Sequence, residues 1–377
     1  HAPAGNSPMA PEHSLRHHRR LPLQDSAEVK WRIELRFVDK IIKRNYIGSK
    51  TSLLPFRTAA VEDVVGRYLS DKVFCDLFAG TGVVGRSFKP RVGKVISNDW
   101  EYYSYVLNRN YIGNNKELVG KEELIEELNA LPVVDSGIIY NNYCLGSGSG
   151  RQYYSDDNGK KIDAVRQQIE GWKKSGTIAE DMYYFLLSSL IESSDRIANT
   201  ASVYGAFLKH LKATAQKPLI LSSSSYTLDE SVHEVYNTDA NVLIREIEGD
   251  ILYLDPPYNP RQYGANYHLL NTIAEYKPFE PKGKTGLRPY SRSLYCSKRT
   301  VSESFESLIR DAEFRFIFLS YNNEGLMSMQ DIKSIMSRYG HYDMVSQEHH
   351  RFRADKEENR NHKADKTTEY LHILEKK

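Results

Sequence analysis

The sequence predicts an α/β fold: a doubly wound sheet that carries an inserted, mostly helical domain. Three observations support this prediction. Residues 31–110 and 230–377 alternate short apolar runs of strand length with helical patterns, as strand–helix–strand units do. Two of these runs end in turns that combine an acid with glycine or proline, and ligand sites form where parallel strands end. Residues 111–229 lose this alternation, so we expect them to form the insert.

Residues 1–30 are expected to lie outside the fold. They include His17-His18-Arg19-Arg20 and show no secretory pattern. This composition indicates a disordered leader or a remnant of cloning.

The first turn follows a buried strand at residues 73–77 and opens a helix. Its residues include Gly80, Thr81 and Gly82. With Gly85 they match a dinucleotide-binding fingerprint, which alone is a weak signal. Asp76 would repel a pyrophosphate, whereas a carboxylate there suits a ligand with an ammonium group, such as the methionine end of S-adenosylmethionine. A nicotinamide cofactor remains the alternative.

Three further residues are candidates for the same ligand pocket. Phe78 lies inside the turn, where an aromatic ring lines a ligand more readily than it joins a core. The next expected strand, residues 94–98, ends in Asp99, an acid suited to a ribose diol. Trp100 follows it and either stacks on a cofactor adenine or packs on the sheet.

The insert is expected to contain helices at residues 121–129 and 181–198, with a flexible loop at Gly146-Ser147-Gly148-Ser149-Gly150. It carries neither a metal-ligand spacing nor a phosphate loop. We interpret it as a module that recognises a partner, and a structural lid or a dimer interface is the alternative.

The second turn, at residues 255–259, is the most informative segment of the chain. An apolar strand at residues 251–254 runs into Asp255, Pro256, Pro257 and Tyr258. Proline donates no backbone hydrogen bond and has a fixed φ, so the neighbouring carbonyls are free to accept hydrogen bonds. A carboxylate, a free carbonyl and a ring face suit a planar group with an exocyclic amine. The alternative is a Pro-Pro loop in which the acid has no role. Later strands are expected at residues 316–320 and 370–374.

Together, the two turns resemble the signature of the Dam-like, or α-group, N6-adenine-specific DNA methyltransferases of restriction–modification systems. Asn45-Tyr46-Ile47-Gly48-Ser49-Lys50 resembles a third motif of this family, an aromatic-x-Gly-x-Lys sequence that precedes the glycine turn. The resemblance covers roughly residues 33–377. It implies a Rossmann-like methyltransferase sheet in residues 31–110 and 230–377, with residues 111–229 reading the DNA target.

The resemblance also implies an activity. The enzyme would transfer a methyl group from S-adenosylmethionine to the N6 amine of an adenine flipped out of double-stranded DNA. It would be cytoplasmic, encoded by a bacterium or a phage, and would share its target with a cognate restriction endonuclease. Whether it is a monomer or a dimer stays open.

Roles for individual residues follow from the resemblance. Tyr46 and Lys50 would bind the methionine end of the cofactor. Asp239 would accept the amine of the cofactor adenine, and an N-cap of the following helix is the alternative. The catalytic residues would be Asp255, Pro256, Pro257 and Tyr258, while Asn259, Arg261 and Tyr263 would hold the flipped nucleotide.

Charge points to a further contact with DNA. The net charge is only +2, yet residues 281–299 contain six basic residues and no acid. We expect Lys282, Lys284, Arg288 and Arg292 to contact phosphates. A solvated charged face is the alternative.

Composition limits the other functions. Three cysteines are too few for a disulfide framework, the histidines lack metal-ligand spacing, and no apolar run could span a membrane. We therefore expect no metal. The competing functions are methylation of cytosine N4, an RNA base or a glutamine side chain, oxidoreduction with a nicotinamide, and DNA binding without catalysis.

Overall fold

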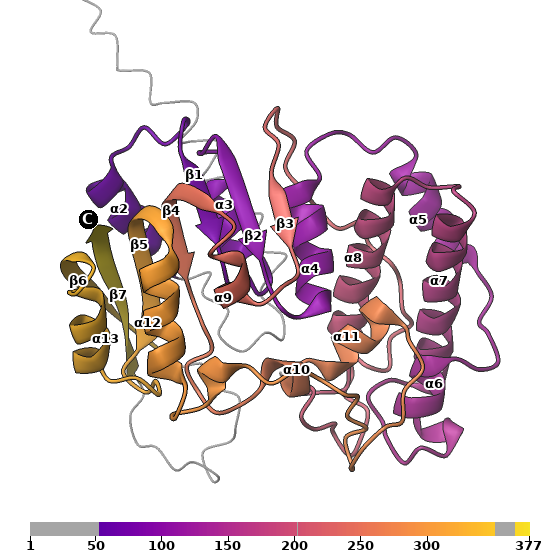
Figure 1. The fold of residues 1–377 in the computed structure, drawn as a ribbon. Coiled ribbons are helices and arrows are strands. Elements are labelled where there is room, and N and C mark those ends of the chain that lie inside the picture. Colours follow the sequence, from indigo (N-terminus) through magenta and orange to yellow (C-terminus); the bar gives the residue numbers. More distant parts are fainter. Residues whose placement is uncertain (1–52, 202, 351–365) are drawn as a thin grey trace, which may run out of the picture. The chain divides into compact units, whose positions relative to one another are not determined.

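One mixed sheet organises the computed structural model, which describes residues 53–201, 203–350 and 366–377 (Figure 1). Its seven strands are β1 (Val73–Asp76), β2 (Lys94–Asn98), β3 (Glu234–Tyr236), β4 (Glu248–Leu254), β5 (Glu313–Asn322), β6 (Gly340–His350) and β7 (Lys366–Lys376). The strands expected at residues 251–254, 316–320 and 370–374 lie within β4, β5 and β7. The α/β class predicted from the sequence is confirmed.

The strand order places a ligand site at the middle of the sheet. The order is β3-β2-β1-β4-β5-β7-β6; neighbours from β3 to β5 are parallel, and β7 is antiparallel to both of its neighbours. The chain moves outward from β1 through β2 to β3 and then returns to β4 on the other side of β1. The order therefore reverses between β1 and β4, and ligands bind at such a reversal, beyond the carboxyl ends of the strands. Asp76 at the end of β1 is in register with Tyr253 of β4, so Asp255 follows two residues beyond this pair.

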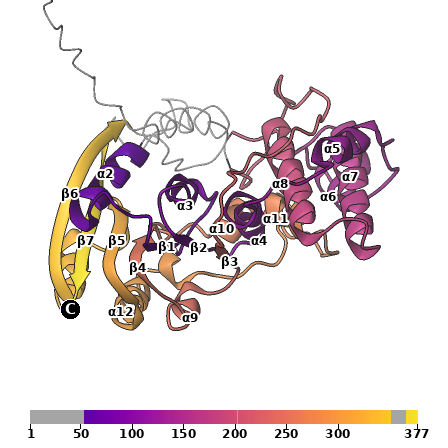
Figure 2. The ribbon, with the colours of Figure 1, turned by 90° about the horizontal axis from the view of Figure 1, so that it is seen from above.

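Helices cover both faces of the sheet. They are α2 (Leu54–Val65), α3 (Val83–Phe88), α4 (Tyr102–Asn108), α9 (Ala240–Leu243), α12 (Val301–Asp311) and α13 (Met329–Met336). Viewed from above, α2, α3 and α4 lie on one face, and α9 and α12 lie on the other (Figure 2). Leu243 of α9, Phe305 of α12 and Ile332 of α13 share a buried apolar core with Leu252 of β4 and Ile317 of β5. This core fixes α9 and α12 beside the carboxyl ends of the central strands.

The helices of the insert pack beyond β3 as a separate layer (Figure 1). They are α5 (Lys121–Ala130), α6 (Ile138–Tyr143), α7 (Asp156–Lys174) and α8 (Glu180–Ile197), which confirms the helices expected at residues 121–129 and 181–198. The Ser155 hydroxyl caps α7 by accepting from Asn158 N. Acids in the first turn of α7 and lysines in its last turn also favour the helix, because they oppose its dipole.

One helix outside the insert belongs to the same layer. Helix α11 (His268–Glu275), which follows α10 (Tyr263–Asn266), packs against α4 and α8. The buried Arg166 of α7 donates hydrogen bonds to the carbonyls of Ile273 and Ala274 at the end of α11. The helical layer is therefore built from two separate segments of the sequence.

A buried lysine joins the insert to the sheet. Lys89, at the end of α3, donates from its Nζ atom to the carbonyl oxygens of Tyr111 (3.2 Å), Asn114 (2.6 Å) and Thr227 (2.9 Å). Residues 111–114 enter the insert, and residue 227 leaves it. Burial lowers the pKa of Lys89 to about 8, and nearby Asp229 opposes this shift. The single ammonium group thus holds both ends of the insert against the helix that follows the glycine turn.

The loop at residues 146–150, which its composition predicts to be flexible, forms several hydrogen bonds in this structure. The hydroxyls of Ser147 and Ser149 both donate to the Cys144 carbonyl, at 2.7 and 2.9 Å. Gly146 N donates to Asp156 at the start of α7. Because serine hydroxyls replace the missing backbone partners, the loop has a defined conformation.

None of the helices in the described part of the chain is both long enough and apolar enough to cross a membrane.

Candidate active site

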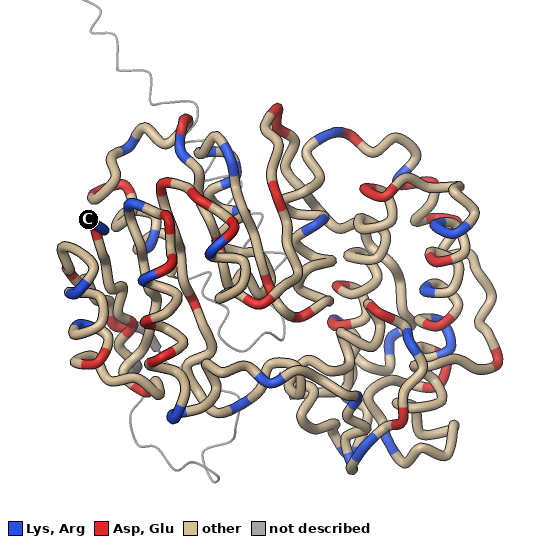
Figure 3. The backbone as a smooth tube through the Cα atoms, viewed as in Figure 1, with Lys and Arg blue, Asp and Glu red and all other residues tan. Residues whose placement is uncertain are grey.

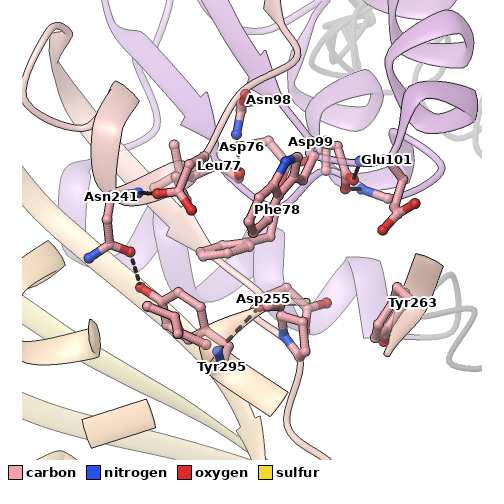
Figure 4. Close-up of a pocket in the computed structure, with 18 of the residues that line it drawn as sticks. Asp76, Leu77, Phe78, Asn98, Asp99, Glu101, Asn241, Asp255, Tyr263 and Tyr295 are labelled. Atoms are coloured by element: carbon pink, nitrogen blue, oxygen red, sulfur yellow. Dashed lines mark hydrogen bonds between the residues drawn. The ribbon is translucent and has the colours of Figure 1, made fainter. Parts of the chain in front are cut away.

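A cavity of about 420 Å³ lies where the strand order reverses (Figure 4). Its wall contains eleven of the residues predicted from the sequence: Asp76, Phe78, Gly80, Thr81, Asp99, Trp100, Asp239, Asp255, Pro257, Tyr258 and Tyr263. Figure 4 shows Asp76 and Asp99 on one side and Asp255 and Tyr263 on the other. The expected cofactor residues and the expected catalytic residues therefore share one cavity.

The glycine turn, residues 77–82, shapes one end of this cavity. Gly80 and Gly82 have φ angles of 54° and 73°, which favour glycine. A Cβ atom on Gly82 would lie 2.5 Å from Asn108 Oδ1, so the turn and α4 can approach each other only with glycine there. Gly82 itself does not line the cavity; it closes the turn.

Asp99 fixes the turn to the next strand. Its Oδ2 atom accepts a hydrogen bond from Gly80 N at 2.8 Å, and its Oδ1 atom accepts from Glu101 N at 2.9 Å. Burial raises its pKa, and these backbone hydrogen bonds oppose the shift. Asp99 therefore organises the backbone in addition to lining the site.

Asp76 is the least satisfied acid of the site. Its Oδ2 atom accepts from Gly85 N at 2.9 Å, but its Oδ1 atom has no hydrogen-bond partner, although the residue is only 1% exposed. Burial raises the pKa of Asp76 to about 7. The Gly85 bond opposes the shift, Asp255 and Asp99 add to it, and Arg57 reduces it. A buried acceptor without a donor is costly unless a ligand supplies one.

Arg57 of α2 lines the same end of the cavity and was missed in the sequence. Its Nη2 atom donates to Ser320 Oγ (3.0 Å) and Glu369 Oε1 (3.4 Å), while Nε and Nη1 have no hydrogen-bond partner. The hydroxyl of neighbouring Tyr253 is also without one. Arg57 lies in a helix whose sequence contains no motif for a ligand site, so no local pattern could have identified it as a lining residue.

The opposite end of the cavity is aromatic and polar. The rings of Phe78 and Tyr295 meet edge to face with centroids 5.1 Å apart, and the Tyr295 hydroxyl donates to Asn241 Oδ1. Asp239 also lies here. Its Oδ1 atom caps α9 by accepting from the backbone N–H groups of residues 241 and 242. Asp239 is thus an N-cap and a lining residue at once.

The segment Asp255–Tyr258, called here the catalytic tetrad, leads from β4 along the cavity wall. Asp255, Pro257 and Tyr258 line the cavity, and Pro256 is buried beside them. Tyr258 packs edge to face on Tyr321, with centroids 6.4 Å apart. Burial raises the pKa of Tyr258 to about 12, so its hydroxyl stays protonated near neutral pH.

Two lining residues near the tetrad escaped the sequence analysis. Gln262 exchanges hydrogen bonds with the backbone of Ser293, accepting from its N–H at 2.8 Å and donating to its carbonyl at 3.4 Å. Glu101 accepts from Asn271 Nδ2 of α11, and burial raises its pKa to about 7. Glu101 stands two residues after Asp99, a position that the strand pattern could have pointed to.

The residues expected to contact DNA lie outside the cavity, except for Tyr263. Asn259 accepts from the backbone N–H of Arg261, which is exposed. Lys282, Lys284 and Arg292 are exposed as well. Arg288 is instead largely buried and paired with Glu275 at 2.8 Å, so its charge already has a partner within the protein.

Two of the expected cofactor residues, Tyr46 and Lys50, lie outside the described residues. Within residues 53–201, 203–350 and 366–377, no group of three or more His, Cys, Asp or Glu side chains is placed to hold a metal ion.

The fold and the site define a class of enzyme: an α/β transferase whose carboxylate-Pro-Pro-Tyr turn and cofactor turn meet in one cavity. A sequence profile of the D12 class N6 adenine-specific DNA methyltransferases matches residues 46–335. The chain belongs to this family, whose members use S-adenosylmethionine and act on DNA.

Individual relatives agree with this assignment. The chain is 64% identical over 332 residues to the type II methyltransferase M.NlaIII of Neisseria lactamica, an alignment that covers 88% of this chain and 99% of the relative. It is 37% identical over 317 residues to the type II methyltransferase M.CviAII of Paramecium bursaria Chlorella virus 1, which covers 82% and 92%. It is also 40% identical over 308 residues to the type II methyltransferase M.FokI of Planomicrobium okeanokoites, but that alignment covers 78% of this chain and only 47% of the relative.

Proposed function

We propose that this methyltransferase modifies the N6 amine of an adenine flipped out of duplex DNA, within a specific target sequence read by residues 111–229. The observation that carries the proposal is the shared cavity: the catalytic tetrad and the glycine turn line the same space. A base and a cofactor bound there would meet without further movement of the sheet.

The described residues fit S-adenosylmethionine. At one end of the cavity, an open carboxylate oxygen of Asp76 and open guanidinium nitrogens of Arg57 suit the ammonium and carboxylate of an amino acid group. At the other end, Phe78 and Tyr295 offer ring surfaces, and Asp239 offers a carboxylate for an adenine amine. Asp99 keeps lone pairs for a ribose hydroxyl, because each carboxylate oxygen can accept more than one hydrogen bond.

The catalytic tetrad acts on the target amine. The lone pair of an adenine amine is delocalised into the ring, which makes the nitrogen a poor nucleophile. Asp255 and the carbonyl of Pro256 accept its two hydrogens, so the nitrogen becomes more tetrahedral and its lone pair is directed toward the methyl donor. The cofactor supplies a methyl group that is already activated by a positively charged sulfur. The protein therefore contributes mainly orientation.

Tyr258 and its neighbours hold the base outside the duplex. An amine in a base pair is out of reach of a cavity, so the base must leave the stack. The ring of Tyr258 is fixed by Tyr321 and offers a stacking surface beside Asp255. Tyr263 borders the same space, and Asn259 and Arg261 would contact the sugar and phosphate of the flipped nucleotide.

The biological role follows from the relatives. Because the chain is similar to type II methyltransferases over 88% and 82% of its length, we assign it to the modification half of a restriction–modification system. A restriction endonuclease with the same target would be its functional partner.

The test is an Asp255→Asn variant. The substitution nearly preserves shape but replaces an acceptor with an amide donor that opposes an amine hydrogen. We expect the single-turnover rate of methyl transfer to fall at least about a hundredfold, a barrier increase of about 2.7 kcal/mol. Binding of DNA and of cofactor should change much less.

Mass spectrometry of digested DNA identifies the product of the unmodified enzyme, and sequencing of modified bases in host DNA gives the target. Near-normal turnover by the variant would contradict the role of Asp255. A methyl group on cytosine or on RNA alone would contradict the proposed substrate.

A further inference from the structure

A small basic hairpin lies in the connection between α11 and α12. Residues 282–287, called here the basic hairpin, are closed by hydrogen bonds from Lys282 N to Leu287 O (2.9 Å) and from Leu287 N to Lys282 O (2.8 Å). Gly283 and Gly286 have φ angles of 67° and 70°. The side chains of Lys282 and Lys284 are exposed, and neither forms an ion pair with another residue of the described part of the chain. The hairpin therefore presents two positive charges on a tight turn.

Arg151 of the insert is hydrogen-bonded to the backbone of this hairpin. The guanidinium of Arg151 donates to the carbonyls of Gly283 (3.1 Å), Lys284 (3.2 Å) and Asn142 (3.2 Å). The hydroxyl of Tyr143 donates to the Gly286 carbonyl at 2.9 Å. Because the guanidinium N–H groups of Arg151 donate to these carbonyls, its side chain supports the backbone of the hairpin and is not directed at an external anion.

The two glycines of the hairpin differ in what surrounds them. A Cβ atom on Gly286 would lie 2.7 Å from Arg151 Nε, whereas a Cβ atom on Gly283 would meet nothing within 4 Å. Both positions carry the same kind of positive φ angle. Only Gly286 thus permits the close approach of Arg151.

A short stretch of chain connects the hairpin to the active site. Ser291, Ser293 and Tyr295 line the cavity eight residues or fewer beyond the hairpin, and Ser293 is bonded to Gln262 after the catalytic tetrad. In Figure 1 the orange loop between α11 and α12 reaches the lower edge of the view, the side toward which β4 points. Basic residues gather at its tip (Figure 3). The connection between α11 and α12 therefore carries the hairpin and also supplies part of the cavity wall.

We propose that the basic hairpin is a preformed contact for phosphates of the DNA backbone, and that Arg151 is a positioning residue that holds it in shape. This inference rests on the proposed duplex DNA substrate. Two lysines on a rigid turn bind phosphates without the cost of ordering a flexible loop. Gly286 is required because a side chain there would displace the guanidinium. Arg288 takes no part, since Glu275 already pairs with it.

The first experiment measures equilibrium binding of the full chain to a duplex, with bound cofactor analogue, between 50 and 200 mM salt. Each phosphate contact contributes about 0.9 to the slope of log affinity against log salt. The double variant Lys282→Ala/Lys284→Ala should therefore lower the slope by about 1.8. Over this fourfold salt range, the unmodified protein should lose about twelvefold more affinity than the double variant. An unchanged slope overturns the phosphate contact.

The second experiment tests the positioning role with charge-neutral variants. Gly286→Ala should weaken DNA binding severalfold more than its matched control Gly283→Ala, which has a similar φ but open space. An unchanged cofactor affinity in both variants would show that the fold is intact. In the Lys282→Ala/Lys284→Ala background, Gly286→Ala should add little, because the two lysine side chains that the hairpin positions are already gone. An equal loss in both backgrounds overturns the proposal.

The outcomes also separate this inference from the proposed function. If the unmodified protein methylates adenine in duplex DNA but the lysine and glycine variants bind like it, only the hairpin assignment fails. If no duplex is bound or methylated by the unmodified protein, the proposed function itself fails.

Discussion

Two buried aspartates, one at the end of strand β1 and one in the insert, differ in how far the protein itself satisfies their hydrogen bonds. Asp163 of α7 is fully buried, and both of its oxygens are used: Oδ1 accepts from Ile139 N (2.9 Å) and the Tyr276 hydroxyl (2.6 Å), and Oδ2 accepts from Tyr140 N (2.8 Å). Asp76 is buried to the same degree but leaves Oδ1 without a partner. Burial raises the pKa of both carboxyls. The difference lies in how completely the protein itself satisfies them.

The same contrast extends to their surroundings. In the insert, Asn199 donates to the carbonyls of Gln152 and Leu208 and accepts from Lys212 N, so its amide is fully used. Around Asp76, by contrast, Arg57 and Tyr253 also keep polar atoms without partners. Buried polar atoms are nearly always satisfied in folded proteins. The insert also has buried hydroxyls without a partner, on Tyr154, Ser194 and Thr200. At Asp76 and Arg57, however, the unsatisfied atoms line a cavity that a ligand can enter, and they indicate what the cavity binds.

The largest effect on stability is expected at Asp163. Replacing it with alanine leaves two backbone N–H groups at the start of α6 and the Tyr276 hydroxyl without their acceptor. We expect the free energy of unfolding to fall by about 3 kcal/mol. Urea denaturation measures this change, and Asp76→Ala serves as the matched control because it leaves only one donor, Gly85 N–H, without its acceptor. Equal losses in the two variants would contradict the distinction drawn here.

Asp76→Ala should instead affect ligand binding. Without the carboxylate, the ammonium of S-adenosylmethionine loses its counter-charge, and we expect its dissociation constant to rise at least about tenfold, or about 1.4 kcal/mol. Calorimetry without added metal measures this change. Asp163→Ala, studied under conditions where it is folded, should bind the cofactor normally. Unchanged affinity in a folded Asp76→Ala variant would remove Asp76 from the site.

The smallest of the three effects is a dependence of cofactor affinity on pH. The pKa of Asp76 is raised to about 7, so a substantial fraction of the carboxyl is protonated in the empty cavity near neutral pH, while the ionised form binds an ammonium group. Binding therefore releases a proton, and affinity falls as the pH falls. Between pH 7 and pH 6 the ionised fraction drops from one half to one eleventh, so we expect affinity to fall about fivefold.

Two variants make this pH experiment specific. Asp76→Asn should bind weakly and show little change in affinity over the same pH range. Glu101→Gln should retain the change, even though the pKa of Glu101 is also raised to about 7. A flat profile in the unmodified protein, or one abolished by Glu101→Gln, would assign the proton to another group.

Local patterns in the sequence were sufficient for five of the seven described strands and for the two turns, whereas β3 and β6 were not expected. Strand length, apolar runs and the glycine and proline residues are all short-range signals, and they located β1, β4 and the lining residues Asp76, Asp99 and Asp255. Arg57 could not be found in this way, because its partners Ser320 and Glu369 lie 263 and 312 residues away.

Long-range packing also explains the other differences. Helix α11 joins the insert's helices through Arg166, a contact between segments more than a hundred residues apart. Arg288 was counted with the phosphate-binding residues because sequence shows charges but not their partners, and the structure pairs it with Glu275. The separate roles of the two glycines in the basic hairpin depend on Arg151, which no periodicity connects to them.

The ion pair between Arg57 and Glu369 also bears on how the protein is made. It joins the first described helix to the last strand, and Ser320 bridges the two at 3.0 and 2.6 Å. A ribosome that adds 5–20 residues per second needs roughly 15 to 60 s to travel from one partner to the other. During that interval Arg57 lacks Glu369, and this end of the cavity remains incomplete. The nascent chain therefore cannot complete this end of the cavity before residue 369 has been added.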